Sequence, residues 1–301
     1  MIFKYDNPAI ALFAYNRPLH FEKTIISLSK NYNINEFDLY IFIDGPKNED
    51  DIYKSKIIKK IIKKTKKFNN INIIESKKNK GLKNSIISGV AKIFESYKKI
   101  IVLEDDVLTS RYFINYMRNA LNFYENNELI GTVSGYSFIN PEENYLENFY
   151  LSQRHASWGW GTWKENWDNL NWNRNWALDF LNDVDFKKKF NNAGEDMYHI
   201  LDQQMKNKIN SWAIIYNLNC FFNKQYCLCP RKGMVFNIGM DGTGVHCKKD
   251  DTVFSNFDPN FNVDKFHKIK TNINIMKKIN KSFHTPIYKR VINKINKIFK
   301  N

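Results

Sequence analysis

The N-terminal half of the chain alternates short apolar runs with longer segments in which isoleucine and leucine recur at helical spacing, as in Asp50–Lys67. The short runs are typical of buried β-strands, and the longer segments of amphipathic helices. Such alternation, with short connections, predicts a parallel sheet covered by helices on both faces. The expected strands are Ala9–Tyr15, Leu39–Ile43, Ile71–Ile74 and Lys99–Leu103.

The composition fits a single large α/β domain. Of the 301 residues, 43% are hydrophobic and 15% aromatic, which is enough to fill a core and excludes global disorder. We expect two halves of this domain, residues 1–130 and 131–250, followed by a tail, 251–301. No Gly-x-x-x-x-Gly-Lys-Ser/Thr or Gly-x-Gly-x-x-Gly motif occurs, which argues against a P-loop or a dinucleotide-binding Rossmann site.

The positive charge is concentrated at the C-terminal end. The chain carries 46 Lys and Arg against 31 Asp and Glu, a net charge of +15, and 11 of the cations follow Asp264 without any acidic residue. A basic tail on a nearly neutral globule is not the pattern of a nucleic-acid-binding domain, and no RNA- or DNA-binding motif is present. We therefore expect no nucleic-acid partner.

The tail itself has an amphipathic pattern. After Pro286, apolar residues recur at helical spacing with lysines between them, as in a basic helix that lies on an anionic membrane surface. Alternatively, its apolar face packs on the catalytic domain or on a second subunit. With no signal peptide and no run of apolar residues long enough to span a bilayer, we expect a cytoplasmic chain. Residues 265–301 would then hold it peripherally on the inner face of the cell membrane.

Polar side chains follow the carboxyl ends of the expected strands. In an open parallel sheet these ends meet at one edge, where ligands bind. Two of the strand ends carry carboxylates and two carry cations, so together they could hold a nucleotide, a pyrophosphate and a divalent metal. The residues concerned are Arg17, Asp44, Lys80 and the acidic triplet Glu104-Asp105-Asp106.

The acidic triplet is the most specific of these signals. Adjacent carboxylates repel one another and are costly at a sheet end unless a cation lies beside them. Mn²⁺ or Mg²⁺ would suit this position, because both prefer carboxylate and phosphate oxygens. Alternatively, the triplet belongs to a solvated loop or to a helix N-terminus, where acidic residues interact favourably with the helix dipole.

Six of the seven tryptophans lie between Trp158 and Trp176. Gly159 and Gly161, which flank Trp160, would let the backbone approach a ligand closely, and indole rings suit the apolar faces of sugars. Alternatively, these tryptophans fill a core. The sequence leaves both interpretations open.

Two later segments carry further candidates. A carboxylate in Gly194-Glu195-Asp196, or Asp202 on the expected helix before a strand at Ser211-Trp212, could act as a general base, although an acidic residue on a helix is more often simply solvated. The glycine-rich segment Asn237–His246 could close over a ligand and supply His246 to a metal, or it could be a plain surface loop.

In this order the motifs resemble bacterial sugar-nucleotide glycosyltransferases of the GT-A fold, and look closest to those related to N-acetylglucosaminyltransferase I. The resemblance covers about residues 8–247, and its specific parts are the acidic triplet and Trp158–Trp163. It implies a Mn²⁺- or Mg²⁺-dependent inverting transferase. The enzyme would move a hexosyl or N-acetylhexosaminyl group from a nucleotide sugar, such as a UDP-sugar, to an oligosaccharide or glycolipid acceptor. A lipooligosaccharide or capsule precursor would be such an acceptor.

The resemblance also implies a role for each candidate. Residues 1–130 would bind the donor and residues 131–250 the acceptor. Asp202 fits the general base best. Glu195 and Asp196 stay as alternatives, because Leu201 stands before Asp202 where the resemblance leads us to expect a tryptophan. A non-catalytic sugar-binding relative and a basic nucleic-acid-binding protein remain alternatives to the enzyme. The implied metal ligands are Asp106 and His246, and the implied nucleotide-sugar contacts are Arg17, Asp44, Lys80, Glu104, Asp105, Gly159, Trp160 and Gly161.

Overall fold

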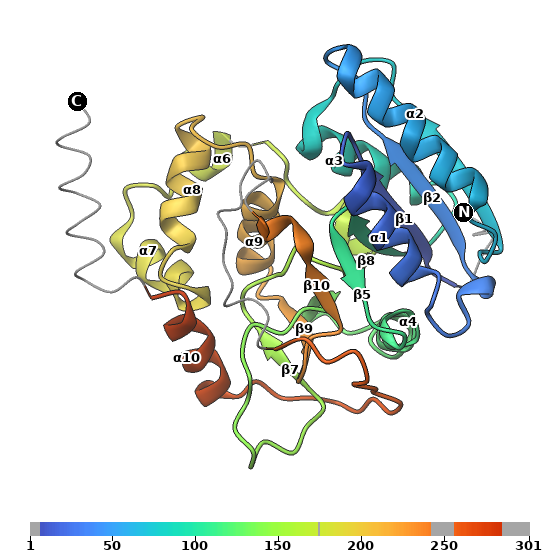
Figure 1. Cartoon of the computed structure of the whole chain (residues 1–301). Helices are drawn as coiled ribbons and strands as arrows, with labels where there is room; N and C mark the ends of the chain where they lie inside the picture. The colour runs from blue at the N-terminus through green and yellow to red at the C-terminus, as the bar shows by residue number, and fades with distance from the viewer. Residues whose placement is uncertain (1–6, 174, 242–255, 285–301) are drawn as a thin grey trace.

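The computed structural model describes residues 7–173, 175–241 and 256–284, and a single eight-stranded sheet forms its centre (Figure 1). The strands are β1 (Ala9–Ala14), β2 (Asp38–Ile43), β3 (Asn70–Glu75), β4 (Lys99–Glu104), β6 (Ile130–Ser134), β7 (Phe149–Ser152), β8 (Trp160–Trp163) and β9 (Tyr226–Pro230). Their order across the sheet is β3-β2-β1-β4-β8-β6-β9-β7. Only β8 and β7 run against the other strands, so the predicted mostly parallel α/β sheet is confirmed.

Helices cover both faces of the sheet. Side chains of successive strand residues point to opposite faces, so Ile10 and Leu12 join one core and Ala11 and Phe13 the other. The first core receives α1, α2 and α4, and the second receives α3 and α9. These helices are α1 (Pro18–Leu28), α2 (Glu49–Lys64), α3 (Gly81–Ile93), α4 (Phe113–Phe123) and α9 (Trp212–Phe222).

Local chemistry explains where the early helices begin. Pro18 occupies the first turn of α1, where its missing N–H leaves no hydrogen bond unmade. Asn48 caps α2 by accepting a hydrogen bond from the Asp51 N–H at 2.9 Å, and acidic residues fill the first turn. Both helices therefore start close to the carboxyl ends of β1 and β2, which leaves the residues between strand and helix at the ligand-binding edge.

The second half of the chain completes the same sheet, which the sequence pattern did not predict. The Trp-rich segment contains β8, inserted between β4 and β6. The expected strand at Ser211-Trp212 was wrong. Ser211 instead caps α9 by accepting from the Ile214 N–H, and nearly every residue of α9 from Trp212 to Cys220 is buried. A second sheet pairs β5 (Val107–Thr109), directly after the acidic triplet, with β10 (Val235–Asn237).

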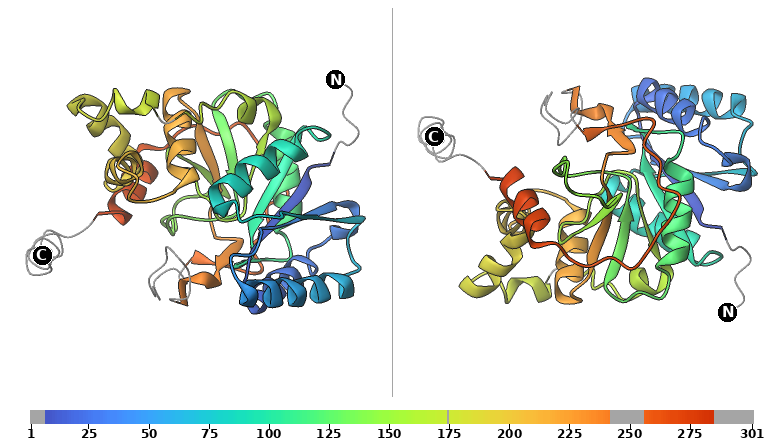
Figure 2. Two further views of the ribbon diagram at one scale, coloured as in Figure 1. Left: turned by 90° about the horizontal axis from the view of Figure 1, so that it is seen from above. Right: turned by 90° about the horizontal axis from the view of Figure 1, so that it is seen from below.

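Shorter helices and 3-10 turns complete the fold. The α-helices are α5 (Lys164–Asp168), α6 (Asn175–Leu178), α7 (Val184–Phe190), α8 (Met197–Met205) and α10 (Ile273–Ser282), and 3-10 turns span Ile34–Glu36, Asn191–Ala193 and Ile238–Asp241. In both views of Figure 2, α10 lies against the group formed by α7 and α8, and Asn280 of α10 donates a hydrogen bond to the Asn191 carbonyl. Ile275 and Ile279 anchor α10 beside Tyr150 of β7.

The amphipathic helix predicted after Pro286 lies outside the described residues, as does His246. Within the described part of the chain, no helix combines the length and the apolar character needed to cross a bilayer.

Candidate functional site

The acidic triplet lies where β4 turns into β5. Asp106 Oδ2 accepts a hydrogen bond from Arg17 Nη1 at 2.7 Å, and the two side chains form an ion pair. Asp106 Oδ1 accepts a second hydrogen bond from Asn237 Nδ2 at 3.2 Å. The Ile238 N–H donates to the Asp106 carbonyl at 2.8 Å. Asp106 therefore joins the residue that follows β1 to the loop that follows β10, and the sequence motifs around Arg17 and Asn237 meet at one carboxylate.

The other two carboxylates of the triplet differ in their contacts. Asp105 is 8% exposed, and its Oδ2 accepts from the Tyr15 N–H at 3.3 Å, so it ties the ends of β1 and β4 together. Glu104 is partly exposed, and within the described residues its carboxylate accepts no hydrogen bond. Of the three side chains, Glu104 therefore has the most freely available oxygens for a ligand.

Electrostatics at this edge disfavour three simultaneous negative charges. Burial, reinforced by the charges of Asp106 and Asp105, raises the pKa of Glu104 to about 8. Burial and the Asp106 charge likewise raise the pKa of Asp105 to about 7. Burial also raises the pKa of Asp106, although the Arg17 guanidinium acts in the opposite direction. A divalent cation placed here would favour the ionised form of all three carboxyl groups.

The residues present fit a metal that takes few protein ligands. Within the described ranges, no group of three or more His, Cys, Asp or Glu side chains converges as a closed metal site. Mg²⁺, and Mn²⁺ with similar ligand preferences, commonly uses one or two carboxylates and completes its shell with substrate phosphates and water. A Cβ atom on Gly239 would lie 2.1 Å from Asp106 Oδ2, so only glycine lets the loop after β10 approach this carboxylate.

The raised pKa values predict a pH-dependent stability. A carboxyl whose pKa is higher in the folded state than in the unfolded state stabilises the fold only below the unfolded pKa, near 4. That contribution is lost as the pH rises through the folded pKa values of about 7 and 8. We expect the melting temperature of metal-free protein to fall between about pH 5 and pH 8, and Mn²⁺ to restore it most strongly at the higher pH.

Differential scanning calorimetry on wild type and on the Glu104→Gln variant measures this effect. The variant lacks one of the shifted groups, so its melting temperature should depend less steeply on pH. Identical profiles for the two proteins would show that Glu104 does not titrate as the structure indicates.

Asp44 is bound by the backbone around it. Its Oδ1 accepts from the N–H groups of Gly45 and Lys80 at 2.8 and 2.9 Å, and its Oδ2 accepts from the Gly81 N–H at 2.9 Å. This carboxylate thus fixes the start of α3, and its direct contact with the donor stays a prediction. The Lys80 ammonium is exposed and borders a pocket of about 250 Å³ between Asp44 and Ser88.

Replacing Asp44 by alanine should destabilise the fold. The change leaves three backbone N–H groups without their acceptor, and hydrogen bonds to a charged group are worth about 1.5–3 kcal/mol each but are not additive, so we expect the free energy of unfolding to fall by roughly 2–4 kcal/mol. Asp44→Asn keeps one acceptor oxygen and should cost less. Urea denaturation measures both variants, and an unchanged midpoint for Asp44→Ala would contradict this role.

Most of the Trp158–Trp163 segment belongs to the core. Trp160 is 1% exposed and packs on Trp167, Trp212 and Tyr216. A Cβ on Gly161 would lie 2.6 Å from the Ile100 carbonyl, because β8 is inserted closely beside β4. We therefore correct the expectation that Trp160 and Gly161 border the donor sugar.

Gly159 forms the turn before β8. It has φ +56°, and a Cβ there would meet Val235 Cγ1 at 2.6 Å, so both backbone conformation and space require glycine. The preceding Trp158 remains partly exposed and faces the pocket described next.

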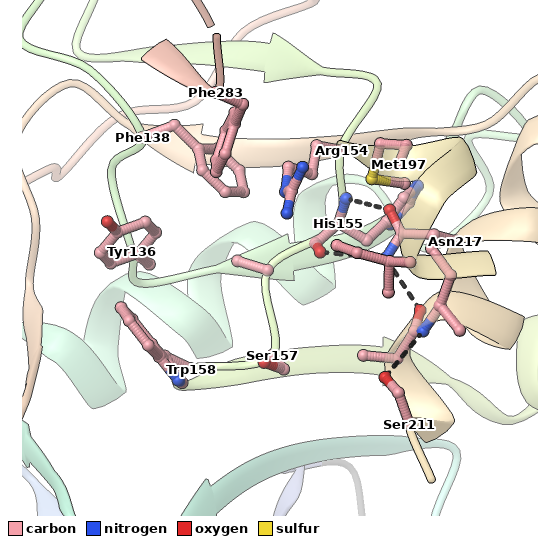
Figure 3. A pocket seen from close by; sticks show the side chains of 14 residues that line it. Tyr136, Phe138, Arg154, His155, Ser157, Trp158, Met197, Ser211, Asn217 and Phe283 are labelled. Carbon is pink, nitrogen blue, oxygen red and sulfur yellow. Dashed lines mark hydrogen bonds between the residues drawn. The ribbon is translucent and has the colours of Figure 1, made fainter. Parts of the chain in front are cut away.

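A pocket of about 230 Å³ opens beside this turn (Figure 3). Strands β8 and β4 are antiparallel, and Trp160 of β8 pairs with Val102, two residues before Glu104. The pocket-lining residues just before Trp160 therefore lie toward the edge of the sheet that carries the triplet. Sequence analysis missed the other walls of the pocket. Arg154 lies in a polar segment without a motif, and Phe283 comes from the end of α10, far along the chain. The aromatic and polar residues that line this pocket include Tyr136, Phe138, Arg154, Ser157, Trp158 and Phe283.

The three candidate bases lie in different surroundings. Both Asp196 oxygens accept hydrogen bonds from the pocket residue Arg154, at 2.6 and 3.0 Å. Glu195 Oε2 forms an ion pair with His284 Nδ1 at 2.7 Å. Asp202 pairs with Lys206 at 2.7 Å and lies about 200° around α8 from the pocket residue Ile200. Asp202 therefore points away from the pocket, and the preference for it is corrected in favour of Asp196.

No protein-family model matches the sequence, and no curated protein matches it. Solved structures align with it at low identity. Mannosyltransferase PcManGT from Pyrobaculum calidifontis, in complex with GDP-Man and Mn²⁺, aligns over 54% of this chain and 46% of its own, with 9% identity and a TM-score of 0.39. S. aureus TarS aligns over 76% of this chain and 36% of its own, with 10% identity and a TM-score of 0.43.

A UDP-glucose pyrophosphorylase complexed with UDP-glucose aligns over 74% of this chain and 90% of its own, with 13% identity and a TM-score of 0.38. The chain spans less than half of the first two structures.

Proposed function

We propose that this chain is a metal-dependent glycosyltransferase with a nucleotide-sugar donor. The observation that carries the proposal is the acidic triplet at the carboxyl end of a parallel strand, with raised pKa values and with Arg17 paired to Asp106. Carboxylates and a guanidinium at one edge are what a divalent cation and a diphosphate require together. Residues 1–130 would form the donor half of the domain and residues 131–250 the acceptor half.

Within this proposal, Asp106 and Glu104 would hold Mn²⁺ or Mg²⁺, with His246 as a further ligand. When bound, the metal would stabilise the charge of the departing nucleoside diphosphate. Arg17 presents its guanidinium at the same edge, and Lys80 presents an ammonium beside the neighbouring strand end, so both would contact the phosphates or the nucleotide. Asp105 would act indirectly, by holding the ends of β1 and β4 together.

Asp196 would take the proton from the attacking hydroxyl of the acceptor as a general base. The site would then use one base and no enzyme nucleophile, which gives a single displacement with inversion at the anomeric carbon, through an oxocarbenium-like transition state of the kind seen in glycoside hydrolysis. The transferred group would be a hexosyl or N-acetylhexosaminyl residue from a UDP-sugar.

The proposed acceptor is a surface glycan such as a lipooligosaccharide or capsule precursor. The lipid anchor of such an acceptor would place it at the membrane. The basic residues of 265–301 would bring the enzyme to the same anionic surface by electrostatic attraction. Co-sedimentation with anionic vesicles tests this part of the proposal. Full-length chain should bind them better than a chain ending at His284, which keeps the packed helix α10 and Phe283 but lacks five of the cations, and equal binding would contradict a membrane role for the tail.

Isothermal titration calorimetry of UDP, with and without Mn²⁺, tests the central claim. A donor site of this kind should bind UDP tightly only with the metal, because the diphosphate completes the metal's ligand shell. A sugar-binding relative without catalysis would bind sugars without gaining nucleotide affinity from Mn²⁺. A nucleic-acid-binding protein would instead bind polynucleotides in a strongly salt-dependent way.

A further inference from the structure

The pocket beside Asp196 presents a continuous row of aromatic rings. Trp158 and Tyr136 meet edge to face with centroids 5.0 Å apart, Tyr136 and Phe138 do so at 5.3 Å, and Phe138 and Phe283 at 5.9 Å. All four side chains are partly exposed and line the same cavity. Partly exposed aromatic faces of this kind suit the apolar C–H faces of a sugar ring.

The charges around this pocket cancel. Among the described lining residues, Arg154 alone carries a permanent charge, and its guanidinium is paired with both oxygens of Asp196. Burial lowers the pKa of the lining His155 to about 4, so this side chain is neutral at physiological pH. The described part of the pocket therefore has no surplus cation that would favour a carboxylate or phosphate group on its ligand.

Arg154 is held in place from two further sides. Its guanidinium lies over the Phe283 ring at 3.7 Å, and a Cβ on Gly194 would come within 2.6 Å of Arg154 Nη1. Gly194 has φ +147°, which also favours glycine. Arg154 is thus fixed between Asp196 at the start of α8 and Phe283 after α10, and Phe283 contacts both the aromatic row and the guanidinium.

Polar groups complete the pocket. The Ser157 hydroxyl lines it, and within the described residues this hydroxyl has no hydrogen-bond partner. The Ser211 hydroxyl oxygen accepts from the Ile214 N–H, which leaves its own O–H available as a donor. With a volume of about 230 Å³, the pocket is smaller than the ~300–1,000 Å³ of sites for drug-sized ligands, so it fits about one pyranose ring.

We infer that this pocket is the acceptor subsite, that its paired charges favour an uncharged sugar ring, and that Phe283 of the C-terminal segment is one of the rings on which that sugar stacks. That the bound sugar is the acceptor of transfer rests on the proposed function. Binding of a neutral sugar ring in the pocket can be measured independently of that function. The sugar ring would stack on the aromatic row, and its hydroxyl groups would exchange hydrogen bonds with the hydroxyl groups of Ser157 and Ser211. Its attacking hydroxyl would then lie near Asp196.

Saturation-transfer NMR on the full chain tests the inference with three probes: methyl β-glucoside and methyl β-galactoside as neutral sugars, and glucuronic acid as a charged counterpart. We expect signals from at least one neutral glycoside and weaker signals from glucuronic acid. In Phe283→Leu, which keeps an apolar side chain but removes the ring, the apparent affinity for that glycoside should fall on the order of 10-fold.

The matched control is Phe123→Ala. Phe123 is an exposed phenylalanine of α4, on the opposite face of the sheet, and its replacement should leave sugar binding unchanged. The inference is overturned if no neutral glycoside binds wild type, if glucuronic acid binds as well as the neutral probes, or if Phe283→Leu binds like wild type. Manganese-dependent UDP binding, measured on the same samples, reports separately on the donor site, so a failure there would count against the proposed function and not against the sugar pocket.

Discussion

Replacing Asp106 by asparagine is expected to abolish Mn²⁺-dependent UDP binding and to lower sugar transfer on the order of 10³-fold. Asparagine preserves the size of the side chain but removes the charge that binds a metal. The loss should not unfold the domain, because Asp106 lies at the end of the sheet and contributes polar contacts to Arg17 and Asn237, not core packing. Transfer assays across a Mn²⁺ titration, together with the melting temperature of the variant, measure both effects.

Asp50→Asn is the matched control. Asp50 is an exposed acidic residue near the start of α2, and among the described residues it pairs only with Lys54, one helical turn away. Its replacement should change neither nucleotide binding nor transfer. If Asp106→Asn kept most of its activity at saturating Mn²⁺, the acidic triplet would not be a metal site and the proposed mechanism would be wrong.

Replacing Asp196 by asparagine should lower kcat by about 10²–10⁴-fold, which is the usual contribution of a general base. The amide has nearly the shape of the carboxylate but cannot accept the proton of the attacking hydroxyl. Donor affinity should be retained, because Asp196 lies beside the aromatic pocket and no described contact joins it to the triplet. Steady-state kinetics with the donor concentration varied separates the two quantities.

Asp202→Asn provides a comparison on the same helix. Asp202 faces away from the pocket and pairs with the exposed Lys206, so we expect transfer close to wild type. The reverse result, with Asp202→Asn inactive and Asp196→Asn active, would restore the assignment that the sequence pattern favoured. An inactive Glu195→Gln beside an active Asp196→Asn would move the base to Glu195.

Much of the donor edge could be predicted from the sequence because its residues are local to strand ends. An apolar run followed by a polar motif defines both the strand and the edge, and parallel pairing brings such ends together. Arg17 and Asp106 are 89 residues apart, yet the pattern placed both at one edge, and the structure joins them by an ion pair. The specific contacts of that edge were not predictable, and the backbone hydrogen bonds of Asp44 are the clearest example.

The second half of the site was not predictable in the same way. A Trp-Gly-Trp-Gly-Thr-Trp run looks alike whether it lines a pocket or fills a core, and only the insertion of β8 between β4 and β6 buries Trp160. Helical position separates Asp202 from Asp196, but only packing shows which side of α8 faces a cavity.

The sequence by itself determined the α/β class and the polar residues at the carboxyl ends of the first strands, because strand alternation and strand-end motifs act over a few neighbouring residues. Tertiary structure alone decided the position of β8, the orientation of α8 and the arrival of Phe283 beside Arg154. These features depend on contacts between segments more than 40 residues apart, as for Arg154 and Asp196, whose separation is 42. No local periodicity encodes such contacts, since they are fixed only when the segments pack together.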